Sequence, residues 1–147
     1  MSRTKDELVP ILIRYFMAAS LMSQEFDKHL RSPKDHALAN RNPMAFLISK
    51  AGLKMCLWYG MLYVVVEGWQ EAKLSDPEVD RLLSSPNTEL LRRFRNGMFH
   101  FQRDYWLPSK FATFFEPKSK TVEWVRALTT EIRRSLIAEM KTISAKP

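Results

Sequence analysis

The sequence predicts an all-α protein, an antiparallel helical bundle of four main helices and one short helix. Two observations support this. Apolar residues recur at steps of three and four along most of the chain, the spacing that gathers them on one face of a helix. The 147 residues include only four glycines, too few for a turn-rich β-sandwich or a glycine-rich phosphate loop. No repeat or linker divides the chain, so we expect one domain over residues 1–147.

The first helix is expected at about Asp6 to Leu30. Its apolar stripe consists of Leu8, Ile11, Leu12, Tyr15, Ala19, Met22 and Phe26. Pro10 fits a helix only in the first turn, where its missing N–H costs nothing, and that requirement sets the start. The N-terminal residues are charged and no signal-peptide apolar region follows them, so we expect a cytoplasmic protein.

A second, continuous helix is expected to begin at Asn42 as N-cap, with Pro43 at its first position. From Met55 it is apolar on almost every face, which predicts a place at the bundle centre or partly in a subunit interface. Its uncharged run, Met55–Val66, has twelve residues. A membrane span needs about 20 apolar residues, so we expect no membrane crossing.

Three further helices are expected from start signals and spacing. Ser75-Asp76-Pro77-Glu78 predicts a short helix that ends near Ser84. Ser85-Pro86-Asn87-Thr88-Glu89 begins another, whose apolar positions are Leu90, Leu91, Phe94, Met98 and Phe101. The last helix is expected at about Thr121 to Ile143.

The charge of the chain indicates what kind of partner it binds, and its cysteine content limits its disulfide chemistry. The net charge is +7, from 23 basic and 16 acidic residues, which favours anionic partners such as nucleic acid. Between Arg92 and Arg103 lie four arginines and one histidine, with no acid before Asp104. The alternative to nucleic-acid binding is that these residues form only a solvated basic helix face. The single cysteine, Cys56, excludes an intramolecular disulfide and is expected to be buried and inert.

The segment Arg95-Asn96-Gly97-Met98-Phe99-His100 resembles the signature of the HEPN superfamily. That signature has an arginine, a polar residue (often asparagine) directly after it, and a histidine a few positions further on. The flanking Phe101 and Gln102 also resemble HEPN sequences. The resemblance covers six to eight residues closely and the remainder of the chain only as an all-α architecture.

The resemblance implies a metal-independent endoribonuclease, a toxin or phage-defence effector with an antitoxin partner, that leaves 2′,3′-cyclic phosphate ends. In this interpretation His100 is the general acid and base, because histidine titrates near neutral pH. Arg95 stabilises the charge on the reacting phosphate with its planar fork. Asn96 orients the phosphate or the histidine. No cofactor and no metal are expected.

The expected RNA contacts are the remaining cations near the motif, Arg92, Arg93, Arg103 and Lys110. Lys110 lies in an aromatic stretch that could stack unpaired bases or form a satellite core under a loop. The alternative function is a non-catalytic HEPN-like module that binds RNA or a protein partner through the same helix.

The spacing of the motif raises a geometric problem. Five steps of about 100° place Arg95 and His100 about 140° apart on an unbroken helix. Distortion at Gly97 or a site built from two chains would bring them together. The resemblance implies the second, since HEPN sites typically form where two motifs meet across a homodimer. The residues also allow a purely structural role, in which Arg95 pairs with Glu89 or with an acid on another helix, and His100 caps the helix or fills a half-buried position.

The sequence gives weaker support for a metal site and for a regulatory tyrosine. His29 and His36, with Asp27 and Asp35 nearby, match no standard metal-ligand spacing. Some HEPN toxins carry a tyrosine two residues after the histidine that a partner nucleotidyltransferase modifies, but Gln102 occupies that position here.

Overall fold

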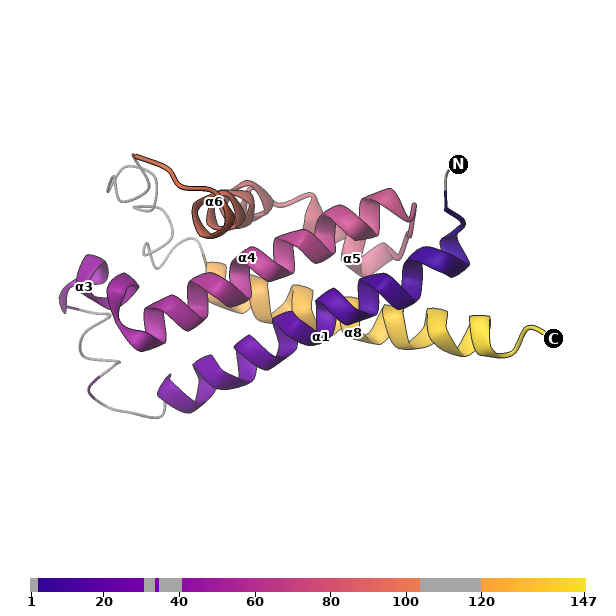
Figure 1. Cartoon of the computed structure of the whole chain (residues 1–147), viewed down its shortest axis with the longest axis horizontal. Helices are drawn as coiled ribbons and strands as arrows, with labels where there is room; N and C mark the ends of the chain where they lie inside the picture. The colour runs from indigo at the N-terminus through magenta and orange to yellow at the C-terminus, as the bar shows by residue number, and fades with distance from the viewer. Residues whose placement is uncertain (1–2, 31–33, 35–40, 104–119) are drawn as a thin grey trace.

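The structure is a computed structural model that describes residues 3–30, 34, 41–103 and 120–147. Over these residues the protein is helical and contains no strand, which confirms the all-α prediction (Figure 1). Within these residues the main helices are α1 (Lys5–Leu30), α4 (Lys50–Glu71), α6 (Asn87–Phe99) and α8 (Thr121–Ser144), and two short helices are α3 (Pro43–Ile48) and α5 (Pro77–Leu83).

The arrangement of the helices is visible in Figure 1. Helix α1 runs antiparallel to both α4 and α8, and α6, seen nearly end-on, packs across α4. The ion pair between Lys5 and Glu139 joins the start of α1 to the end of α8. Within the described residues, none of the helices combines the length and the apolar character needed to cross a membrane.

Helix α4 forms the centre of the core, as its all-round apolar pattern predicts. Trp58 and Tyr59 are fully buried, and Trp69 and Cys56 are nearly so. A row of aromatic rings crosses the bundle from Phe26 of α1 through Trp58 and Tyr59 to Phe94 of α6, with centroids 5.7, 5.1 and 5.3 Å apart. Each such ring pair adds about 0.5–1.5 kcal/mol beyond the area that it buries. This row therefore holds α6 against the centre.

The predicted second helix is not continuous, and this corrects the sequence interpretation. Asn42 does cap α3 by accepting a hydrogen bond from the Ala45 amide at 3.1 Å. The chain then leaves the helix at Ser49 (φ −72°, ψ 165°), whose hydroxyl accepts from the Gly52 amide and starts α4. A Cβ at Gly52 would lie 1.9 Å from the Phe46 carbonyl oxygen, so only glycine permits this close crossing.

The first helix also differs from expectation. Thr4 and Glu7 form a capping box, in which the Thr4 amide donates to Glu7 at 2.7 Å and the Glu7 amide donates to the Thr4 hydroxyl at 3.4 Å. Helix α1 therefore begins at Lys5, and Pro10 lies in its second turn rather than its first. Pro10 is exposed, so water can reach the carbonyl that its missing N–H leaves without a helix bond.

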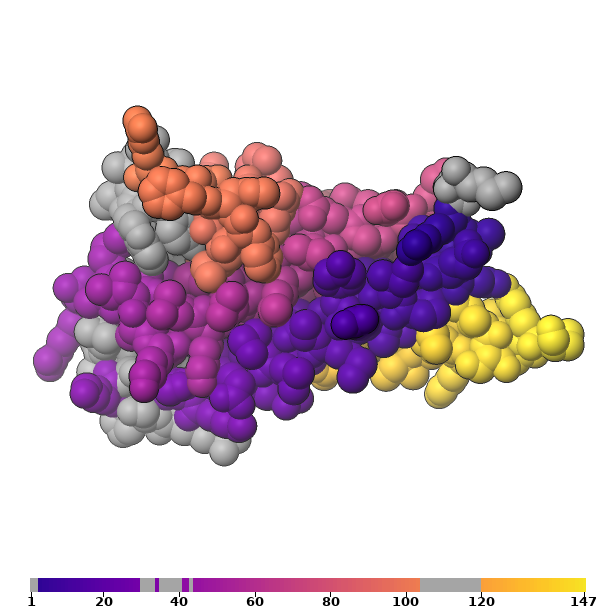
Figure 2. Space-filling view, in the orientation of Figure 1, coloured from indigo at the N-terminus to yellow at the C-terminus, as the bar shows by residue number. Residues whose placement is uncertain are grey.

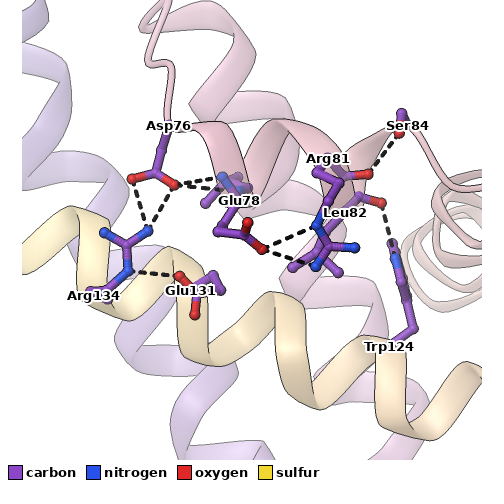
Figure 3. A network of polar contacts seen from close by, with 9 residues as sticks. Asp76, Glu78, Arg81, Leu82, Ser84, Trp124, Glu131 and Arg134 are labelled. Carbon is purple, nitrogen blue, oxygen red and sulfur yellow. Dashed lines mark hydrogen bonds and ion pairs between the residues drawn. The ribbon is translucent and has the colours of Figure 1, made fainter.

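Helix α5 begins where the sequence signal predicted and packs against α8 (Figure 3). Asp76 caps α5 by accepting from the amides of Glu78 and Val79 at 3.1 and 3.3 Å. On the other side, the Trp124 indole of α8 donates a buried hydrogen bond of 2.9 Å to the Leu82 carbonyl. These contacts fix the start of α5 and seat α8 beside it.

Candidate nucleic-acid site at the end of helix α6

Helix α6 lies close against α4 because of Gly60. A Cβ at Gly60 would lie 3.4 Å from the Arg95 Cα and 3.4 Å from the Phe99 ring, at the limit of ordinary contact. Leu91 and Phe94 are buried on the same side of α6. The motif therefore begins on a helix face that is partly turned toward the centre of the bundle.

Helix α6 ends inside the motif, and this corrects two expectations. His100 has an extended backbone (φ −134°, ψ 130°), and its amide donates to the Asn96 carbonyl at 3.0 Å as the C-cap. Phe101, expected at an apolar helical position, is 96% exposed. The angle of about 140° between Arg95 and His100 on an unbroken helix therefore does not apply, and Gly97 lies within α6.

Arg95 is held by α4. Its Nη2 donates to the Glu67 carboxylate at 2.5 Å, and its guanidinium carbon lies 5.5 Å from the centre of the Tyr63 ring. The Arg95 side chain is 22% exposed, and its Nε is buried with no hydrogen-bond partner in the described part of the chain. Of the pairings open to the sequence, an acid on another helix is the one observed, while Glu89 pairs with Arg92 at 2.6 Å.

Burial and neighbouring charges shift the pKa values of Tyr63 and Glu89 near this contact. Burial raises the pKa of Tyr63, and the negative charge of Glu67 raises it further. The hydrogen bond from Arg92 lowers the pKa of Glu89. At neutral pH Tyr63 is therefore a protonated phenol and Glu89 is a carboxylate.

The other predicted residues are spread around the end of α6. Asn96 is half-buried on α6, and Arg93 is half-buried on the same helix. His100 and Arg103 are exposed and follow the end of α6 in the chain. Figure 2 draws this part of the chain in orange, at one corner of the molecule. Lys110 lies outside the described residues. Among the described residues no hydrogen bond joins the Arg95 side chain to Asn96 or His100, and its partner there is Glu67.

Sequence reasoning missed Glu67 and Tyr63. Both lie on one face of α4, one turn apart, and Glu67 is the first charged residue after the uncharged run Met55–Val66. An acid directly after such a buried run needs a cationic partner on a neighbouring helix when it is not fully solvated. That signal could have indicated Glu67 but could not have selected Arg95.

The candidate metal ligands are separated or lie outside the described residues. Asp27, which the sequence places near His29, binds Arg126 at 2.6 Å. His36 and Asp35 lie outside the described part. Within residues 3–30, 34, 41–103 and 120–147 there is no group of three or more histidine, cysteine or acidic side chains that could hold a metal ion.

Comparison of the chain with family models, with curated proteins and with solved structures found no match. The assignment of a function therefore rests on the residues and their geometry.

Proposed function

We propose that this protein is a metal-independent endoribonuclease of the HEPN type that acts as a homodimer. One observation carries the proposal. At the end of α6, a half-buried arginine with an unused buried donor is followed, within one motif, by a histidine that is open to solvent. We further propose that it acts in the cytoplasm as a toxin or phage-defence effector under the control of an antitoxin.

The proposed reaction is an internal transfer at phosphorus. His100 removes the proton of the ribose 2′-hydroxyl, whose oxygen attacks the adjacent phosphorus, and the bond to the 5′ oxygen breaks. A second imidazole, or the same one after exchange, returns a proton to that leaving oxygen. The products are a 2′,3′-cyclic phosphate and a 5′-hydroxyl. Asn96 orients the phosphate or the histidine.

Arg95 can serve this reaction without leaving Glu67. A guanidinium has five N–H donors, and the contact with Glu67 uses Nη2 alone. The carboxylate and the Tyr63 ring fix the plane of the group, and its remaining donors can bind a phosphate oxygen. In this proposal Glu67 and Tyr63 are positioning residues for Arg95.

A second chain would complete the site. Phe99 is 46% exposed and Phe101 is 96% exposed, so two aromatic rings face solvent beside the motif. Two exposed aromatic side chains so close together favour a protein–protein contact. A two-fold dimer through this corner would place the motif of one protomer opposite that of its partner. Sedimentation should give twice 17.2 kDa, and a stable monomer would contradict the composite site.

The second candidate, a non-catalytic module that binds RNA or a protein, is favoured by a different feature of the same contact. Because Glu67 neutralises Arg95, the arginine could simply join α6 to α4. Arg92, Arg93 and Arg103 would then carry the binding. This candidate predicts affinity without cleavage.

RNA cleavage in the presence of EDTA separates the two candidates. The wild-type protein should cut RNA, leave 2′,3′-cyclic phosphate ends and spare DNA, which lacks the 2′-hydroxyl. His100→Ala should slow cleavage by about 10²-fold or more, the usual effect of losing general acid–base help. His29→Ala, on α1, is the matched control and should cut at the wild-type rate.

Two results of this cleavage experiment would contradict the ribonuclease proposal. Cleavage that persists in His100→Ala comes from another site or a contaminant. If the wild-type protein binds RNA, cuts none and does not slow the growth of cells that express it, the binding module is the better assignment.

A further inference from the structure

A second surface, remote in sequence from the motif, is an apolar groove between α1 and α8, which we call the α1–α8 groove. It has a volume of about 440 Å³. Its apolar walls come from Ile13, Phe16 and Met17 of α1 and from Leu136, Ile137 and Met140 of α8. No residue of the α6 motif lines it, so binding at this groove is independent of the proposed ribonuclease activity.

The groove is open and its apolar surface extends beyond it. Met17 is 61% exposed and Ile137 is 51% exposed, and Leu21, one turn further along α1, is 58% exposed. Along α8 the lining runs from Arg133 to Ser144, roughly 16 Å or three helical turns at 1.5 Å per residue. An open apolar strip of this length matches a helix better than a compact ligand.

The cations of the groove lack acidic partners. Arg133 and Lys141 line it on either side of Ile137, at steps of four residues, and neither has a carboxylate partner in the described part of the chain. Arg133 instead lies over the Phe16 ring at 5.7 Å. The neighbouring Arg134 and Lys146, by contrast, are paired with Asp76 and Asp6. The groove thus presents uncompensated positive charge along an apolar floor.

We propose that the α1–α8 groove binds an acidic amphipathic helix of a partner protein. The apolar face of that helix would lie against Met17, Ile137 and Met140, and its acidic flank would bind Arg133 and Lys141. Methionine side chains adapt to such a face, and opposite charge selects the partner and sets its direction. A second copy of this chain fits poorly, because a two-fold contact would bring Arg133 and Lys141 of both protomers to one interface.

Methionine-methyl NMR with a synthetic peptide tests the proposal. The probe is a helical peptide of about 16 residues with leucines at i, i+4, i+7 and i+11 and glutamates on both flanks. Addition of this peptide should shift the methyl signals of Met17 and Met140 and leave that of Met55, buried in α4, in place. The same peptide with lysine in place of glutamate should bind roughly tenfold more weakly or worse.

Two variants and a control locate the contact. Ile137→Glu should weaken binding roughly tenfold or more by placing a charge in the apolar floor, and Arg133→Glu should do so by repelling the acidic flank. Both residues are exposed, so the fold should persist. Ile48→Glu, at a 64% exposed apolar residue of α3, is the matched control and should bind like the wild type.

Three results would overturn the proposal. The first is the absence of any shift at Met17 and Met140 with millimolar peptide. The second is equal binding of the acidic and basic peptides. The third is a wild-type dimer that Ile137→Glu converts to a monomer, because the groove would then be an interface between copies of this chain.

Discussion

Two arginines, Arg134 and Arg95, each join two helices through a carboxylate, but their donors are used differently. Arg134 of α8 donates through Nη2 to both oxygens of Asp76 at 2.7 and 2.8 Å, and through Nε to Glu131 at 2.6 Å (Figure 3). Arg95 of α6 donates through Nη2 to Glu67, whereas its Nε is buried without a partner among the described residues.

This difference separates a structural arginine from a candidate functional one. Arg134 is half-exposed and satisfied by two acids, one of which also caps α5, so its contacts are explained by the fold alone. A buried donor without a partner costs about 1–3 kcal/mol and calls for a reason. Arg95 thus has a donor that the described contacts do not use, which is why we assign the chemistry to the end of α6.

The largest expected effect compares the two arginines in the cleavage reaction. Arg95→Ala should slow RNA cleavage by about 10²-fold, the typical loss when a fixed donor to a developing charge is removed. Arg134→Ala should leave the rate within about twofold, because in the described part of the chain the ion pairs of Arg134 are with Asp76 and Glu131, away from the motif. Initial rates on one RNA substrate measure both. Equal losses in the two variants would erase the distinction.

For the stability of the fold, the Arg134 contact should matter more than the Arg95 contact. Asp76→Ala should lower the free energy of unfolding by about 1–2 kcal/mol, because α5 loses its N-cap. Glu67→Ala should lower it by less than about 1 kcal/mol, since the Glu67 side chain is 43% exposed and water can replace it. Urea denaturation followed by circular dichroism provides the comparison. A larger loss for Glu67→Ala would make Arg95 chiefly a structural contact.

The acid dependence of stability should isolate the Asp76 contact. The hydrogen bond from Arg134 lowers the pKa of Asp76 below its usual 3.8. A lowered pKa adds stability that is present above the unfolded value of 3.8 and is lost as the pH falls through the folded value. The gap in unfolding free energy between wild type and Asp76→Asn should therefore be constant from about pH 5 to 7 and shrink below about pH 4. In an Arg134→Ala background the gap should depend less on pH.

The smallest expected effect concerns Tyr63. Because the charge of Glu67 raises the pKa of Tyr63, Glu67→Gln should lower that pKa, although burial should still keep it above the ordinary value. An NMR titration of the Tyr63 ring measures the change. Glu71→Gln, one turn further along α4, serves as the control. An unchanged Tyr63 pKa in Glu67→Gln would show that Glu67 does not act on the Arg95 site as described.

Local signals predicted most of the helices. Asp76 with Pro77 and Asn42 with Pro43 mark the starts of α5 and α3, because a cap needs only a side-chain acceptor within three residues of the amides that it binds. Spacing and composition also predicted the start of α8 at Thr121 and the burial of Cys56. The homodimer, the antitoxin and the catalytic roles of Arg95, Asn96 and His100 remain predictions.

The sequence by itself determined the helical class, the central place of α4 and the position of the Arg95–His100 motif, since periodicity and capping are properties of neighbouring residues. The tertiary structure alone decided the break at Ser49, the end of α6 at Phe99 and the partner of Arg95. The break depends on a close approach that Gly52 permits, and Glu67 lies 28 residues from Arg95. Pairings over such distances are chosen by how whole helices pack, because many acids lie within reach of an arginine in sequence and only the folded arrangement selects one.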